Sequence, residues 1–85
     1  MSTEIETNPE YLTYALTALP LVNNVSYEFP GVWHIQTEKG AFYLGTANGN
    51  YGWDDGDQIS GETGSETVGG ITLDFQKFIT ELEVK

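Results

Sequence analysis

The chain has 85 residues, with thirteen Asp and Glu, three Lys and no Arg, and its formal net charge is −10 at pH 7. This balance argues against direct binding of nucleic acids or anionic membranes, because both are bound mainly through Lys and Arg. There is no cysteine for a disulfide or a thiolate metal site, the acidic N-terminus does not resemble a signal peptide, and no apolar run approaches the ~18 residues of a membrane span. We therefore expect a cytoplasmic protein.

The first predicted element is a helix that follows a frayed segment, residues 1–7. Asn8 can cap this helix and Pro9 suits its first position. Pro20 ends it, because proline cannot continue a helix. In between, apolar residues recur at helical spacing and form one apolar stripe, namely Tyr11, Leu12, Ala15, Leu16 and Leu19.

Antiparallel strands are predicted next, over residues 25–29, 32–37 and 41–44, where apolar and polar residues alternate or apolar residues dominate. Pro30-Gly31 separates the first two strands as a turn or a bulge. Glu38-Lys39-Gly40 is typical of a hairpin turn, in which Gly40 can adopt a positive φ.

Residues 46–66 are predicted to form a long loop rich in Gly and Asp, and loops of this length tend to be functional or mobile. A short strand could follow around Thr67-Val68. The last element is a helix from about Thr72, which can cap it, and apolar residues follow at i, i+3, i+4 and i+7: Phe75, Phe78, Ile79 and Leu82.

These elements predict one small α+β domain over residues 1–85. It consists of an N-terminal helix, an antiparallel sheet of three to four strands and a C-terminal helix, with the helices packed on one face of the sheet.

Catalysis is not expected. His34 is the sole histidine and lies in a predicted strand, with no cysteine and no recognisable serine motif near it. The loop Asp54-Asp55-Gly56-Asp57 offers oxygen ligands that suit calcium, but its spacing does not match an EF-hand. A solvated acidic turn explains the same residues, so no metal or other cofactor is predicted and a calcium-binding module stays an alternative.

The most suggestive segment places Tyr51 and Trp53 directly before this acidic run. Aromatic residues surrounded by carboxylates suit a basic protein surface, through burial, cation–π contacts and charge pairing. Trp53 could equally fold back over the thin core of so small a domain. The predicted partner-binding residues are Tyr51, Trp53, Asp54, Asp55, Asp57, Glu62 and Glu66.

We therefore expect a small non-catalytic binding protein that blocks a basic surface, such as the cleft of a nucleic-acid-binding enzyme. In size and charge the chain is similar to the DNA-mimic inhibitors carried by phages and mobile elements, although this likeness rests on no shared motif. An alternative is an interaction module or accessory subunit that is acidic only for solubility and binds through a sheet edge or the face that carries Trp33.

Overall fold

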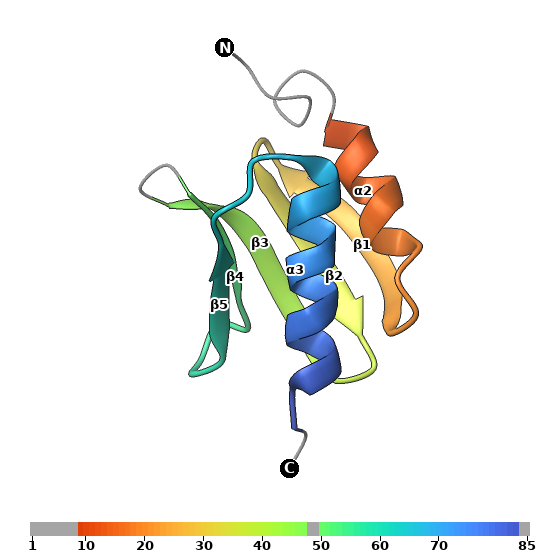
Figure 1. Cartoon of the computed structure of the whole chain (residues 1–85), viewed down its shortest axis with the longest axis vertical. Coiled ribbons are helices and arrows are strands. Elements are labelled where there is room, and N and C mark those ends of the chain that lie inside the picture. The colour runs from red at the N-terminus through yellow and green to blue at the C-terminus, as the bar shows by residue number, and fades with distance from the viewer. Residues whose placement is uncertain (1–8, 48–49, 84–85) are drawn as a thin grey trace.

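The computed structural model describes residues 9–47 and 50–83, and in it two helices flank a five-stranded antiparallel sheet. Both helices lie on the same side of the sheet (Figure 1). The expected fraying of residues 1–7 and the cap at Asn8 fall outside the described residues. In chain order the elements are α2 (Pro9–Thr17), β1 (Val22–Phe29), β2 (Val32–Thr37), β3 (Gly40–Ala47), β4 (Asn50–Asp54), β5 (Ser60–Thr63) and α3 (Val68–Glu81).

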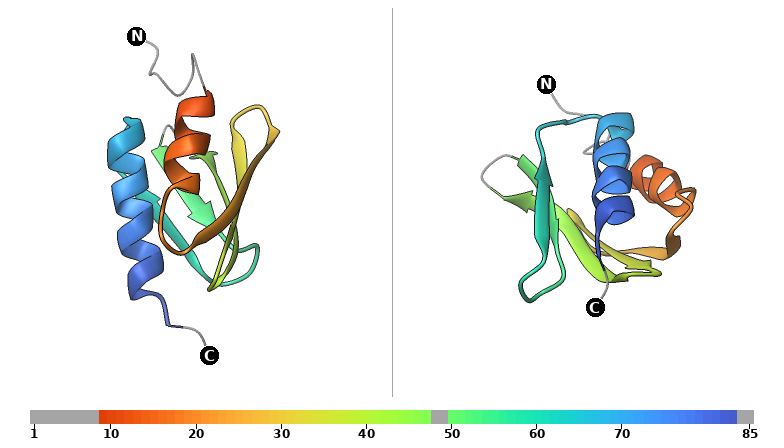
Figure 2. Two further views of the ribbon diagram at one scale, coloured as in Figure 1. Left: turned by 90° about the vertical axis from the view of Figure 1, so that its right-hand side faces the viewer. Right: turned by 60° about the horizontal axis from the view of Figure 1, so that its bottom comes forward.

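The sheet is a meander in which each strand pairs with the next strand along the chain, so β1 and β5 form its two edges. The sheet bends around α3, and α2 packs beside α3 over β1 (Figure 2). This confirms the predicted α+β fold with a helix at each end. The predicted number of three to four strands is too low, because the sheet has five.

The additional strands lie within residues 46–66, where we expected a long loop. Most of this segment is a hairpin in which β4 pairs with β3 on one side and with β5 on the other. Glycines hid the hairpin in the sequence. Gly52 replaces one of the alternating side chains of β4, and β5 is a four-residue strand without an apolar residue. Only pairing with their neighbours makes such segments strands.

The turns of the first three strands follow the sequence prediction. Gly31 has a φ of +85° and Gly40 a φ of +126°, conformations that favour glycine. The Thr37 hydroxyl also stabilises the second turn, since it donates a hydrogen bond to the carbonyl of Gly40 (2.7 Å) and accepts one from the amide of Lys39 (3.0 Å). β1 is longer than predicted and begins at Val22.

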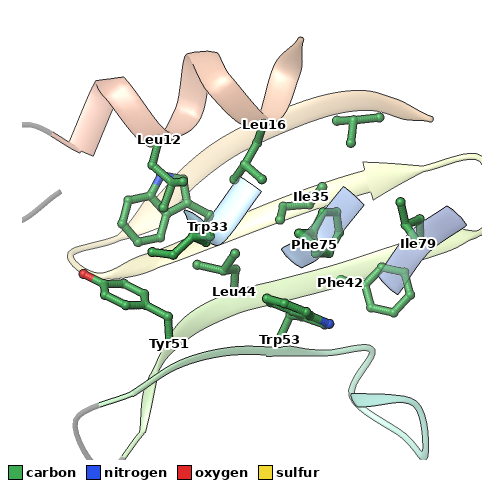
Figure 3. Packing of buried hydrophobic residues seen from close by; sticks show 12 residues of the cluster. Leu12, Leu16, Trp33, Ile35, Phe42, Leu44, Tyr51, Trp53, Phe75 and Ile79 are labelled. Carbon is green, nitrogen blue, oxygen red and sulfur yellow. The ribbon is translucent and has the colours of Figure 1, made fainter. Parts of the chain in front are cut away.

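The core lies between the helices and the covered face of the sheet (Figure 3). Rings from both layers meet edge to face there, with the centroids of Trp53 and Phe75 5.2 Å apart. The indole N–H of Trp33 donates a hydrogen bond to the Thr13 hydroxyl of α2 (2.9 Å), which joins this helix to the sheet. The buried apolar side chains are Leu12, Leu16, Val22, Trp33, Ile35, Phe42, Leu44, Tyr51, Trp53, Ile71, Phe75 and Ile79.

The C-terminal helix begins four residues earlier than predicted. Thr67, rather than Thr72, is the N-cap, and its hydroxyl accepts a hydrogen bond from the amide of Gly70 (3.0 Å). The strand expected around Thr67-Val68 is therefore the first turn of α3. Two consecutive glycines in that turn concealed it, because glycine is a poor helix former.

Candidate functional site on the open face of the sheet

The candidate site lies on the open face, by which we mean the face of the sheet that points away from both helices. Side chains alternate between the two faces of a strand, so an exposed residue whose neighbours along its own strand are buried in the core can be assigned to the open face. One cross-strand row there comprises His34, Tyr43, Asp54 and Ser60. The next row comprises Gly45, Gly52 and Glu62.

Gly45 and Gly52 are direct cross-strand partners and together leave a gap between the larger side chains. A Cβ atom built on Gly45 would lie 3.2 Å from the carbonyl oxygen of Gly31 and 3.7 Å from a methyl group of Val32. One built on Gly52 would lie 3.0 Å from the carbonyl oxygen of Gly61 and 3.4 Å from the Cβ of Glu62. The gap is thus bounded by Val32 on one side and Glu62 on the other. A shallow groove of about 340 Å³ occupies this part of the surface, and Tyr43, Asp54 and Ser60 also line it.

The charges around this groove have one sign. Asp54 and Glu62 contribute carboxylates, whereas the described lysines lie elsewhere. The Lys39 ammonium reaches the end of α3, where it donates hydrogen bonds to the carbonyls of Thr80 (3.0 Å) and Leu82 (2.9 Å). Lys77 lies on α3 itself. The open face is therefore acidic without a lysine among the residues that the structure describes.

Tyr43 is the aromatic side chain of the groove and is 46% exposed. Its ring centroid lies 4.8 Å from that of His34, with the two planes tilted by 30°. His34 Nδ1 in turn lies 3.9 Å from a carboxylate oxygen of Glu28. Tyr43 was not among the predicted site residues, although its alternation with Phe42 and Leu44 in the sequence indicates that it points away from the core.

The two predicted aromatic contacts are in the core instead. Tyr51 and Trp53 are 7% and 4% exposed and lie on the covered face, where Trp53 packs against Phe75 and Phe78. Trp53 thus covers the core, which is one of the two roles that the sequence left open for it. Neither aromatic side chain offers a surface to a partner, because a domain this small needs its large apolar residues inside.

The aspartates that follow shape the turn between β4 and β5. Asp54 Oδ1 accepts a hydrogen bond from the amide of Gly56 (2.8 Å). Asp55 Oδ1 accepts hydrogen bonds from the amides of Asp57 (2.9 Å) and Ile59 (3.2 Å). Asp54 and Asp55 therefore have structural roles in the turn, as aspartates in turns often do.

The remaining predicted acids are exposed but do not all share one element. Asp57 lies at the tip of the β4–β5 turn, Glu62 lies in β5, and Glu66 lies in the connection between β5 and α3. The structure thus brings Asp54 and Glu62 together on the open face, with the acidic turn next to them.

The described residues contain no group of three or more His, Cys, Asp or Glu side chains arranged to hold a metal ion. In residues 54–57 two of the three carboxylates already accept amide hydrogen bonds from their own turn. Ser26 and His34 pair across β1 and β2, and both approach Glu28, but no hydrogen bond joins Ser26 to His34.

Within the residues that the structure describes, no helix combines the length and apolar character needed to cross a membrane. Compared with known protein families, curated proteins and solved structures, the chain matches none. Its function must therefore be argued from the geometry and charge of the site.

Proposed function

We propose that this protein is a non-catalytic acidic binding protein whose open face docks on a basic surface of another protein. The observation that carries this proposal is the acidic groove of the open face, whose lining includes two carboxylates and neither of the described lysines. Asp54 and Glu62 flank a groove that contains an exposed tyrosine. The ammonium of Lys39 contacts the end of α3, and Lys77 lies within α3. Complementary charge across an interface gives specificity and fast association.

The partner that best fits this surface is an enzyme or other protein that itself binds nucleic acid, since such proteins carry clefts lined by Lys and Arg. Occupation of that cleft would inhibit the partner, as a nucleic-acid mimic does. Asp55, Asp57 and Glu66 would add charge next to the groove. The absence of cysteine suits the reducing cytoplasm, which is where we place this interaction.

The test is a pulldown with the purified protein at 50 mM NaCl, followed by elution with increasing salt. We expect the retained proteins to be basic nucleic-acid-binding proteins that elute below about 0.5 M NaCl, because salt screens exposed charge pairs. The double variant Asp54→Asn, Glu62→Gln should retain less of them. Retention of no such protein by the unaltered chain would refute the proposed function.

A second candidate is an interaction module that binds through apolar contacts and uses its acidity for solubility. Several large apolar side chains favour it, because Tyr14 on α2 is 67% exposed and Phe29 at the end of β1 is 65% exposed. The edge of β1 could also pair with a strand of a partner. The face that carries Trp33 cannot serve, since Trp33 is buried. Binding that survives 0.5 M NaCl and the double variant would favour this module.

A further inference from the structure

We infer that the groove above Gly45 and Gly52 receives a single arginine side chain from the partner. This inference rests on the proposed function and specifies which group the open face recognises. It is carried by three features that occur together, namely a flat floor without side chains, an aromatic wall and two flanking carboxylates.

The floor has the size of a side chain. Val32 and Glu62 lie on strands β2 and β5, which are three strand spacings apart, or about 14 Å between backbones. Only the two glycines stand between them in this row. A planar group placed over β3 and β4 therefore meets no Cβ atom, but only peptide backbone, including the carbonyl oxygens of Gly31 and Gly61 that approach the two glycines.

The walls match the separate parts of an arginine. Val32 supplies an apolar contact for the methylene groups, which long basic side chains readily bury. The ring of Tyr43 can stack with the planar guanidinium, and the Glu62 carboxylate can accept two parallel hydrogen bonds from it. Asp54, the cross-strand partner of Tyr43, adds a second negative charge beside the ring.

Other occupants fit less well. A lysine ammonium is a compact, strongly hydrated charge that cannot stack on Tyr43 or bind a carboxylate in a bidentate manner. An apolar side chain would remove water from Asp54 and Glu62 without replacing their hydrogen bonds, which is unfavourable. A phosphate would be repelled by both carboxylates. The groove therefore selects a guanidinium among the groups that a protein partner can present.

The inference can be tested by NMR titration of the isotope-labelled protein with the peptide acetyl-Gly-Arg-Gly-amide. We expect saturable shifts centred on the amides of Gly45, Gly52 and Glu62. The same peptide with citrulline, which keeps the shape but lacks the charge, should give none, and the lysine peptide should bind several-fold more weakly. Equal binding of the lysine and arginine peptides would overturn the selection of a guanidinium.

Matched variants separate the groove from the general negative charge. Glu62→Gln and Tyr43→Leu should each weaken binding of the arginine peptide about 2–5-fold, which is the range expected from the loss of one exposed charge pair or cation–π contact. Glu81→Gln removes the same charge as Glu62→Gln, but from α3, and should leave binding unchanged. If all variants bind the arginine peptide with equal affinity, the groove is not an arginine site. The same conclusion follows if the chemical-shift changes spread over every acidic segment without saturating.

The titration and the pulldown fail in different ways. If the pulldown retains basic partners and Glu62→Gln weakens their retention more than Glu81→Gln does, but the lysine and arginine peptides bind equally well, the proposed function stands and the arginine site is wrong. If the pulldown retains no basic partner, the proposed function fails whatever the peptide shows.

Discussion

Lys39 joins the turn between β2 and β3 to the C-terminal end of α3. The last carbonyls of a helix have no partner within the helix, and a cation placed there also opposes the negative end of its dipole. α3 has no basic residue in its own last turn and ends at Leu82 without a left-handed capping residue. The ammonium of Lys39, which contacts two of these carbonyls, provides the cap from a distant part of the sequence.

Replacing this lysine should therefore loosen the end of α3. We expect Lys39→Met to lower the free energy of unfolding by about 1 kcal/mol, because two partly exposed hydrogen bonds are lost while the aliphatic stem is kept. Urea unfolding followed by circular dichroism measures the change. Lys77→Met alters the net charge equally and should have less effect, so an equal loss in both variants would assign the effect to charge alone.

Gly61 is required by the position of Trp53. A Cβ atom at residue 61 would lie 2.5 Å from the indole Nε1 and 3.3 Å from the ring of Phe78. The buried indole N–H has no hydrogen-bond partner among the described residues, so the ring is held there by packing rather than by a polar contact. Only a residue without a side chain leaves room for it.

We expect Gly61→Ala to lower the free energy of unfolding by roughly 1–3 kcal/mol, as overpacking does. Tryptophan fluorescence during urea unfolding reports both the stability and the displaced indole. Gly64→Ala is the matched control, since a Cβ atom at Gly64 meets nothing within 4 Å. A neutral effect of Gly61→Ala would show that the Trp53 ring can shift without loss.

At the scale of elements, the first turn of α3 contains two glycines, of which one has room for a side chain and the other does not. A Cβ atom on Gly69 meets nothing within 4 Å, whereas one on Gly70 would clash with the hydroxyl of Ser65 and lie 2.6 Å from its Cβ. The connection from β5 thus crosses α3 directly above Gly70. Ser65 is held there by its contact with the capping hydroxyl of Thr67.

The two alanine variants should therefore change stability in opposite directions. Gly69→Ala should raise the free energy of unfolding by about 0.5–1 kcal/mol, the difference in helix propensity. Gly70→Ala should lower it, because Ser65 must move away from its position beside the cap. Thermal unfolding of both variants side by side measures the signs, and stabilisation by Gly70→Ala would refute the close packing proposed for this turn.

The sequence predicted the elements whose signal is local. Helix α2, the strands β1 to β3 and the apolar face of α3 all have a clear period and recognisable turn or cap residues. β4, β5 and the first turn of α3 were missed because their glycines interrupt these local signals. Pairing with β3 and capping by Thr67 determine their structure, and both depend on the folded protein.

The candidate site was predicted only in part, for a related reason. Asp54 and Glu62 were identified as acids, but the groove depends on the register that places Gly45 beside Gly52 and Gly52 beside Glu62. This register could not be predicted, because β4 and β5 were not recognised as strands. The alternation within residues 51–54 could, however, have shown that Trp53 and Asp54 point to opposite faces once β4 was recognised.

At the scale of the whole molecule, the two faces of the sheet differ in role, because one forms the core and the other carries the candidate site. The buried apolar residues between the covered face and the helices, including both tryptophans, serve stability. The open face is left with carboxylates, an exposed tyrosine and a bare stretch of backbone. The aromatic residues of the predicted loop thus serve the core, and the proposed recognition would depend on side chains that the sheet brings together from different strands.

The net charge of −10 makes a further prediction, about stability rather than binding. The radius of gyration is 11.8 Å, whereas the Debye length is about 30 Å at 0.01 M ionic strength and about 3 Å at 1 M. At low salt every carboxylate therefore repels the others across the whole folded molecule, and these repulsions weaken in the expanded unfolded chain. Added salt should therefore weaken the repulsions between carboxylates more in the folded state than in the unfolded state.

We expect the free energy of unfolding to rise by roughly 1 kcal/mol between 0.01 and 0.5 M NaCl, as the sum of several exposed repulsions of a few tenths each. Urea unfolding at both concentrations measures this rise. A variant with Asp57→Asn, Glu66→Gln and Glu81→Gln should be more stable at low salt and should gain less from added salt. If stability does not depend on salt in either protein, the carboxylates do not strain the fold. A basic partner would then not stabilise the protein by relieving that repulsion, and its affinity would have to come from local contacts such as those in the groove.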